Sequence, residues 1–505
     1  MKNFFCLFSA LLFLQLPGQE VEFRNHKINY KLSYETLKMQ GEEDIGMAGI
    51  GADMFIFEKL PNLYLTLNSY SAITGERPGL ISFGAGLGYV QPLFNSHFAL
   101  DAGVFVGGGG GANAPDGGGL ITREHLNLLY RFKGFSIFGG YSRLDFPTGS
   151  MGGNNLNFGV SVSSSFDTAH MTSANSADDT EMKNHKFRIT MLGTRYLKFF
   201  EGPFPPSSPA NSRENNSQLL GVEIDKFINN RFYAALKLNG AVTGGIDGYM
   251  SYLIGFGYEQ PLWKNSLSLD AQALLGPSGG GGVDTGGGGI VQGTLGLRAD
   301  FGEYGLKAGL GQSYAPEGNF NGTFFELGLT RNFNFISPQS QNNQPYRLKI
   351  GEKLHGFGLE FLNRTYFPPR RLDKNNKEYD KLFNLLGFQL SKDLNKNFSV
   401  LGSTYWAYQG SYGAYAEGWL GLQYAYPFAE NWSVDARFLG GAAGGGGIDL
   451  GSGLAIQYGA GLAGNISDSW VISLNGGKMQ GIKGNFNPYF LDLGIEYKFG
   501  QISKK

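Results

Sequence analysis

The sequence predicts an all-β protein: an antiparallel transmembrane β-barrel built from three tandem repeats of about eight strands each. Three observations support this prediction. A glycine-rich hairpin occurs three times, apolar and polar residues alternate along most segments, and no stretch after the N-terminal segment reaches the length of about 18 apolar residues that a membrane-spanning helix needs. The 505 residues include 79 glycines but only 16 % charged residues, with a formal net charge of −1. This balance gives no indication of nucleic-acid binding.

The glycine-rich hairpin defines the repeat. Its copies read VFVGGGGGANAPDGGGL, LLGPSGGGGVDTGGGGI and FLGGAAGGGGIDLGSGL, each preceded by an aspartate with apolar neighbours. A recurring unit of this length organises the whole fold and has to be identified before single motifs are interpreted. The candidate lumen or repeat-signature residues are Asp101, Asp270, Asp435, Gly107, Gly108, Gly109, Gly279, Gly280, Gly281, Gly444, Gly445 and Gly446.

The N-terminal residues 1–18 have the pattern of a secretory signal peptide. Lys2 precedes the apolar run FFCLFSALLFLQL, which is too short to cross a bilayer as a helix. Cys6, the only cysteine, lies inside this segment, so we expect an exported mature chain without disulfides or zinc–thiolate sites.

Strand patterning divides the remaining chain into three units, 26–166, 185–335 and 346–500, joined by polar linkers at 167–184 and 336–345. Within each unit the alternating segments are roughly 8 to 12 residues long, the length that a tilted strand needs to cross a bilayer. Two closures remain open: three small barrels of about eight strands, or one barrel of about 24 strands with a lumen. Three soluble β-sandwich or barrel domains are a weaker alternative.

The units end alike, in NLNFGVSVSSSF, FFELGLTRNF and YFLDLGIEYKF, and close on Phe166, Phe333 and Phe499. This ending resembles the C-terminal insertion signal of Gram-negative outer-membrane β-barrel proteins, and the resemblance covers the whole mature chain at the level of the class. It implies an outer-membrane location, with outer-membrane lipid and the barrel-assembly machinery as partners. One departure is that residues 501–505 follow Phe499, whereas the aromatic residue of the class is usually terminal.

The glycine runs are not phosphate-binding loops, because no Lys-Ser or Lys-Thr follows them. We expect them to relieve crowding in the barrel wall, or to form a bare patch that another backbone, a sugar ring or a loop approaches closely. The three aspartates either line a lumen as an acidic ring or pair inside the barrel with cations such as Arg123, Arg298 and Lys307. Tryptophans near turns suit the interface girdles of a membrane barrel.

No catalytic, cofactor or metal site is predicted. The histidines lack partners at ligand spacing, and Ser142 and Asp145 have no histidine beside them. The predicted function is therefore a non-enzymatic outer-membrane barrel that acts in channel transport, or as an accessory component of surface export with an exported polymer or surface partner. The alternative is a cell-surface binding or adhesion protein that presents the polar loops 203–217 and 370–381. A lipid-modifying enzyme is the weakest hypothesis.

Overall fold

The computed structural model describes residues 20–172, 181–200, 217–244, 246, 248–263, 266–339, 345–349, 351–380, 382–451 and 453–504. The predicted signal peptide lies outside these residues. The described chain forms 25 strands, all paired antiparallel, which confirms the all-β antiparallel barrel class. In this part of the chain no helix is long and apolar enough to cross a membrane.

The first eight strands close on themselves, because β1 pairs with β2 on one side and with β8 on the other. We call this ring barrel 1. Its strands are β1 (Glu20–Leu37), β2 (Ile45–Phe55), β3 (Leu63–Thr74), β4 (Ile81–Leu93), β5 (Asn95–Gly110), β6 (Leu120–Arg131), β7 (Phe135–Asp145) and β8 (Gly152–Met171).

The next eight strands close in the same way, since β9 pairs with both β10 and β16. This ring is barrel 2. Its strands are β9 (Met182–Phe200), β10 (Gln218–Phe227), β11 (Phe232–Thr243), β12 (Met250–Trp263), β13 (Leu267–Gly279), β14 (Gly289–Phe301), β15 (Tyr304–Tyr314) and β16 (Phe320–Pro338).

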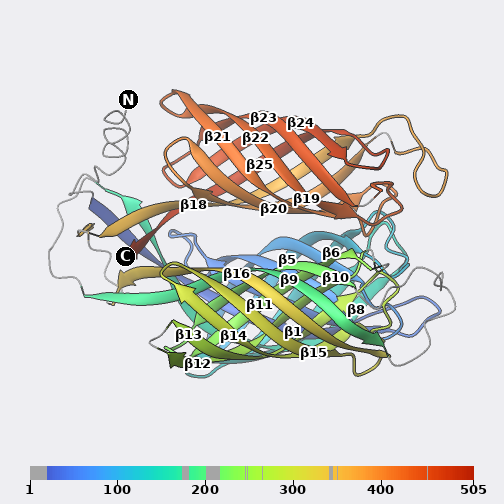
Figure 1. Ribbon diagram of the computed structural model, residues 1–505, viewed down its shortest axis with the longest axis horizontal. Coiled ribbons are helices and arrows are strands. Elements are labelled where there is room, and N and C mark those ends of the chain that lie inside the picture. The colour runs from blue at the N-terminus through green and yellow to red at the C-terminus, as the bar shows by residue number, and fades with distance from the viewer. Residues whose placement is uncertain are drawn as a thin grey trace.

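The last ring, barrel 3, closes through the pairing of β18 with both β19 and β25. Figure 1 shows it in orange and red beside the other two. Its strands are β18 (Glu352–Phe367), β19 (Phe383–Asp393), β20 (Phe398–Gln409), β21 (Ala416–Ala429), β22 (Trp432–Gly444), β23 (Leu454–Asn465), β24 (Trp470–Gly481) and β25 (Tyr489–Lys504). The short β17 (Pro345–Arg347) pairs with β1.

Two of the sequence-based boundaries need correction. The predicted linker 167–184 contains the end of β8, which runs to Met171, and the start of β9 at Met182. The predicted linker 336–345 likewise begins inside β16, which continues to Pro338. These polar ends remain strands because they stay paired within their own rings, Met171 with Val21 and Pro338 with Met182. In addition, β16 of barrel 2 pairs with β25 of barrel 3. The three barrels thereby belong to one continuous hydrogen-bonded network.

The barrel walls are apolar outside and polar inside, the reverse of a soluble barrel. In β14, Leu295 is 57 % exposed and Leu297 is 46 % exposed, whereas Gln292 and Thr294 on the alternate face are buried. Arg298, one residue after Leu297, is only 1 % exposed. Successive side chains of a strand point to opposite faces, so alternation in the sequence becomes an apolar exterior around a polar interior.

The strand ends near the chain termini, here called the terminal end, carry exposed aromatic side chains in all three barrels. Phe94 and Phe132 lie there in barrel 1, Trp263 and Phe301 in barrel 2, and Trp432 in barrel 3. Aromatic rings at this depth are typical of the interface between bilayer and water. The opposite end, the loop end, carries the glycine-rich hairpins. Trp406 and Trp419, which the sequence also placed in a girdle, are instead buried.

All three barrels meet at the terminal end around one apolar cluster. Its buried members are Val21, Phe23, Ala169, Ile336, Tyr346 and Ile502. Ile502 belongs to the short segment that follows Phe499, and this packing accounts for the departure from the class pattern. Each closing pair of strands also carries a histidine hydrogen-bonded to a hydroxyl: His26 to Thr168, His185 to Ser337 and His355 to Ser503.

Candidate functional site: the barrel interiors

Barrel 2 encloses a charged layer at mid-height. Arg298 donates from Nε to Asp270 Oδ2 (2.9 Å) and from Nη2 to Glu223 Oε1 (2.7 Å). Lys307 Nζ lies 2.8 Å from Oε2 of the same Glu223 and 2.8 Å from Glu326 Oε1. All five side chains are almost completely buried. Ion pairs of this kind compensate the desolvation of each charge only while every partner stays in place.

The charges inside barrel 2 nearly balance. Four buried cations face five buried carboxylates, and they are held by β9, β10, β11, β12, β13, β14, β15 and β16. Each strand of the ring therefore contributes to one network. The charged residues are Arg188, Lys237, Arg298 and Lys307 with Glu223, Asp225, Glu259, Asp270 and Glu326.

Barrel 1 has a smaller version of this layer. Lys31 Nζ lies 3.0 Å from Asp101 Oδ2, and the Tyr64 hydroxyl donates to Asp101 Oδ1 (2.6 Å). Arg123 Nε donates to Glu35 Oε1 (2.6 Å), four residues further along β1 from Lys31, toward the loop end. Two cations thus serve three buried carboxylates, because Lys31 Nζ also lies 2.5 Å from Asp53 Oδ2.

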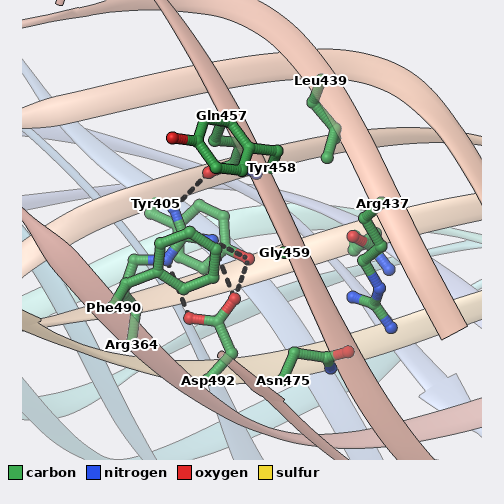
Figure 2. A pocket seen from close by; sticks show the side chains of 11 residues that line it. Arg364, Tyr405, Arg437, Leu439, Gln457, Tyr458, Gly459, Asn475, Phe490 and Asp492 are labelled. Atoms are coloured by element: carbon green, nitrogen blue, oxygen red, sulfur yellow. Dashed lines mark hydrogen bonds and ion pairs between the residues drawn. The ribbon is translucent and has the colours of Figure 1, made fainter. Parts of the chain in front are cut away.

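Barrel 3 centres its layer on Arg364, which Figure 2 shows facing Asp492 beneath the ring of Tyr405. The guanidinium donates to both Asp492 oxygens, from Nε (2.8 Å) and Nη2 (2.7 Å), and from Nη1 to Glu417 Oε1 (2.7 Å). The central carbon of the guanidinium group, Cζ, lies 3.9 Å from the centre of the Tyr405 ring. A planar guanidinium can satisfy two carboxylates and a ring face together, which lysine cannot. The cavity beside this group has a volume of about 10 Å³, room for about one water molecule, and is lined by Gln457 and Asn475, among others.

Above each charged layer, toward the loop end, the interior is filled by aromatic and aliphatic side chains. In barrel 3 this plug contains Tyr366, Phe383, Tyr415 and Phe486, each completely buried. Barrels 1 and 2 have equivalent apolar clusters in the same half. Eight-stranded barrels are just wide enough for side chains to fill. The described interiors therefore contain a polar layer and an apolar plug in series.

The three signature aspartates lie in three different barrels, and each is buried and paired. Asp101 is held by Lys31 and Asp270 by Arg298, while Asp435 accepts from Arg437 Nε at 2.8 Å. Asp270 thus pairs with two of the cations proposed from the sequence, since Lys307 Nζ also lies 4.0 Å from Asp270 Oδ1, whereas Arg123 pairs with Glu35 instead. The three carboxylates do not face a shared lumen, because each ring closes around its own aspartate.

The glycine residues of the signature lie where backbones approach closely. A Cβ atom added to Gly108 would lie 2.5 Å from the carbonyl oxygen of Trp406 in barrel 3. One on Gly279 would lie 2.5 Å from Cα of Gly79 in barrel 1. By contrast, a Cβ atom on Gly444 meets nothing within 4 Å among the described residues. Two of the three runs are therefore contact surfaces between barrels. The other signature glycines lie next to these positions: Gly107 and Gly109 in β5, Gly280 and Gly281 after β13, and Gly445 and Gly446 after β22.

Sequence reasoning missed most of the interior. Arg188, Glu223 and Glu326 in barrel 2, and Arg364 and Glu417 in barrel 3, carry the networks but were not singled out. The available signal was a charged residue on the polar side of an alternating segment, as with Glu223 and Asp225 in LLGVEIDKF. Over the described residues, no group of three or more histidine, cysteine, aspartate or glutamate side chains could hold a metal ion.

Fold and interior together define an antiparallel β-barrel protein with an apolar outer wall and filled interiors, each a charged layer followed by an apolar plug. No protein-family model matches the chain, and no curated protein matches it either. Among solved structures, the chain is similar to OpdQ of Pseudomonas aeruginosa, with 8 % identity over 95 % of this chain and 98 % of that one, at a TM-score of 0.19.

A BenF-like porin from Pseudomonas fluorescens Pf-5 matches with 10 % identity over 95 % of this chain and 98 % of the porin, at a TM-score of 0.21. The siderophore receptor PirA of Pseudomonas aeruginosa matches with 9 % identity over 94 % and 80 %, at a TM-score of 0.26. At such TM-scores the matches do not define the arrangement of the strands, which rests on the pairings described above.

Proposed function

We propose that this chain is a non-enzymatic outer-membrane protein of the transport and export class, and that its three barrels act as an accessory scaffold whose interiors do not conduct. The observation that carries the proposal is the combination of an apolar outer wall with filled interiors. The wall suits hydrocarbon, because closed rings pair the backbone polar groups of their strands. The plug and the charged layer leave each barrel without a continuous water path.

The orientation follows from the two ends. Short turns, the aromatic side chains and the described chain ends share the terminal end, which suits the periplasmic side of an outer-membrane barrel. The loop end, with the longer connections, then faces the outside. On this side, the segment 368–382 of barrel 3 carries the exposed cations Arg370, Arg371 and Lys374. This observation favours the second candidate, a surface-binding role, for the loop 370–381; the other loop named for that role, 203–217, lies almost wholly outside the described residues.

Conductance across a planar bilayer tests the proposal. We expect the purified protein, inserted and confirmed to be folded, to give no stable open steps, because the Arg364 and Arg298 networks are closed. Persistent steps of porin size would contradict the filled-barrel proposal. Cell fractionation tests the location separately: recovery of the mature chain as a soluble protein without detergent would contradict the outer-membrane assignment.

A further inference from the structure

Barrels 1 and 3 meet at the loop end through the glycine hairpin of barrel 1. A Cβ atom on Gly119 would lie 2.5 Å from the carbonyl oxygen of Ala407 in β20. Across the same contact, the Ala414 amide donates to the Gly109 carbonyl (3.2 Å). Figure 1 shows β20 and β5 adjacent to each other at this place. Backbone meets backbone here, which only glycine permits on the hairpin side.

Barrels 2 and 1 meet through the corresponding elements. A Cβ atom on Gly288 would lie 2.6 Å from the carbonyl oxygen of Ala72 in β3. Gly288 holds the same place in its hairpin as Gly119, directly before the sixth strand of its barrel, and Ala72 holds the same place in the third strand as Ala407. One type of contact, glycine hairpin on third strand, is therefore used twice within the chain.

The glycine hairpin of barrel 3 lacks this contact. Gly453 corresponds to Gly119, yet the nearest atom to its added Cβ belongs to its own barrel, at 3.3 Å. Ala442 is exposed, whereas Gly108 and Pro277 at the corresponding position are buried. The glycine hairpin face of barrel 3 therefore has the same construction as the two docked hairpin faces, but no other barrel covers it among the described residues.

The third strand of barrel 2 is the matching surface without a partner. On β11, a Cβ atom added to Gly240 meets nothing within 4 Å among the residues that the structure describes. The corresponding residues of the two docked strands, Ser71 and Trp406, are 2 % and 3 % exposed. Val242, two residues further along β11, is only partly buried. The hairpin face of barrel 3 and the third-strand face of barrel 2 are thus both without a partner barrel among the described residues. They are the same two kinds of face that dock on each other in the other two contacts.

Contacts at the terminal end show that these two faces lie along the same boundary between barrels 2 and 3, here called the seam. Lys392 Nζ of β19 lies 4.6 Å from the centre of the Phe333 ring of β16, and the Phe335 and Phe357 rings are 6.0 Å apart. Lys226, which corresponds to Lys392, makes the same type of contact from the second strand of barrel 2 to β1 of barrel 1. Barrels 2 and 1 share this terminal-end contact and, at the loop end, also the docked glycine hairpin. Between barrels 3 and 2 the seam is joined at one end only.

We propose that barrels 2 and 3 close this seam by docking the β22–β23 glycine face on β11, with the terminal-end contacts as the hinge. Both faces are small and uncharged, so closure desolvates no ion. In hydrocarbon, small residues favour such contacts because they let two backbones approach closely. The chain then has two arrangements, one with the seam open and one with three equivalent contacts. This inference concerns the seam between barrels, so it does not depend on whether their interiors conduct.

Paired cysteines test closure, because the only native cysteine lies in the predicted signal peptide. The test pair is Val242→Cys with Leu454→Cys, measured as disulfide formation in liposomes after mild oxidation. The matched control is Ile73→Cys with Gly289→Cys, since a Cβ atom on Gly289 would lie 3.8 Å from that of Ile73, the usual separation in a disulfide. Val242 and Leu454 hold the same places in the third seam as Ile73 and Gly289 in the docked one.

We expect the test pair to form an intrachain disulfide that goes to completion, at a rate roughly ten- to a thousandfold below the control if the closed arrangement is the minor one. Val242→Cys with Ile472→Cys, which lies on the far wall of barrel 3, should stay reduced. Absence of the intrachain disulfide from the test pair would overturn the proposal. Disulfide-linked dimers in its place would also overturn it, and would assign the face to a second copy of the chain.

Discussion

The Arg364 network of barrel 3 makes the sharpest prediction about stability. Replacement by methionine keeps most of the side-chain volume but removes the two hydrogen bonds to Asp492 and the one to Glu417. Both carboxylates then stay buried without their cation, and breaking a buried pair of this kind costs about 3–5 kcal/mol. We expect the free energy of unfolding to fall by this amount in denaturant titrations of the protein in detergent. Fluorescence reports it, because Trp419 is buried in the interior of this barrel.

A double-mutant cycle separates the lost ion pair from lost packing. Arg364→Met combined with Asp492→Asn removes both charges, and Glu417 keeps its hydrogen bonds from two tyrosines. We therefore expect a coupling free energy of about 2 kcal/mol or more. The control, Arg143→Met, breaks an exposed pair with Asp145 and should cost less than about 1 kcal/mol. A single variant that costs no more than this control, or additive effects in the cycle, would refute the reasoning.

Three further predictions concern the contacts between barrels and the bilayer. Burial raises the pKa of Asp116, in the loop between β5 and β6, to about 6, so its ionised form is disfavoured in the folded protein. The free energy of unfolding should therefore fall as the pH rises from about 4 to 6. In denaturant titrations, Asp116→Asn should raise the free energy of unfolding by about 3 kcal/mol at pH 8 and leave it unchanged at pH 3. Gly108→Val should separate barrels 1 and 3 and shift tryptophan emission to the red, while Gly440→Val, whose Cβ meets nothing within 4 Å among the described residues, should leave the spectrum unchanged. In single-tryptophan variants, brominated lipid should quench Trp263, which is 69 % exposed, but not Trp419, which is 4 % exposed; equal quenching of both would contradict the proposed membrane face.

The class of fold could be predicted because alternation is a local property of the chain. In β14 the sequence IVQGTLGLRADF already separates the outward Leu295 and Leu297 from the inward Thr294 and Arg298. The closure of the rings could not be predicted, because it depends on which distant strands pair. The same eight alternating segments can form a small ring or part of a large one. Only the pairing of His26 with Phe166, and its counterparts in the other barrels, distinguishes the two.

The candidate site was predictable only in part, for a related reason. The recurring Asp270 was found because its neighbours repeat, and its pairing with Arg298 follows from two inward positions on adjacent strands. Arg364 stands alone in its unit and has no such counterpart, so repetition gave no signal. Its partner Asp492 lies 128 residues further along the chain, a distance that spacing arguments do not reach.

Closure into separate rings also determines how the chain can assemble. The β1–β8 pairing that closes barrel 1 joins Val21 to Met171, so this ring can be complete before the later two thirds of the polypeptide have arrived. One large ring would instead leave the first strand unpaired until the last one was delivered, with an open edge exposed to other chains. The apolar junction at the terminal end, however, needs Ile502 from the final strand. The barrels can therefore close one after another, while their joint arrangement is locked only when the last residues are in place.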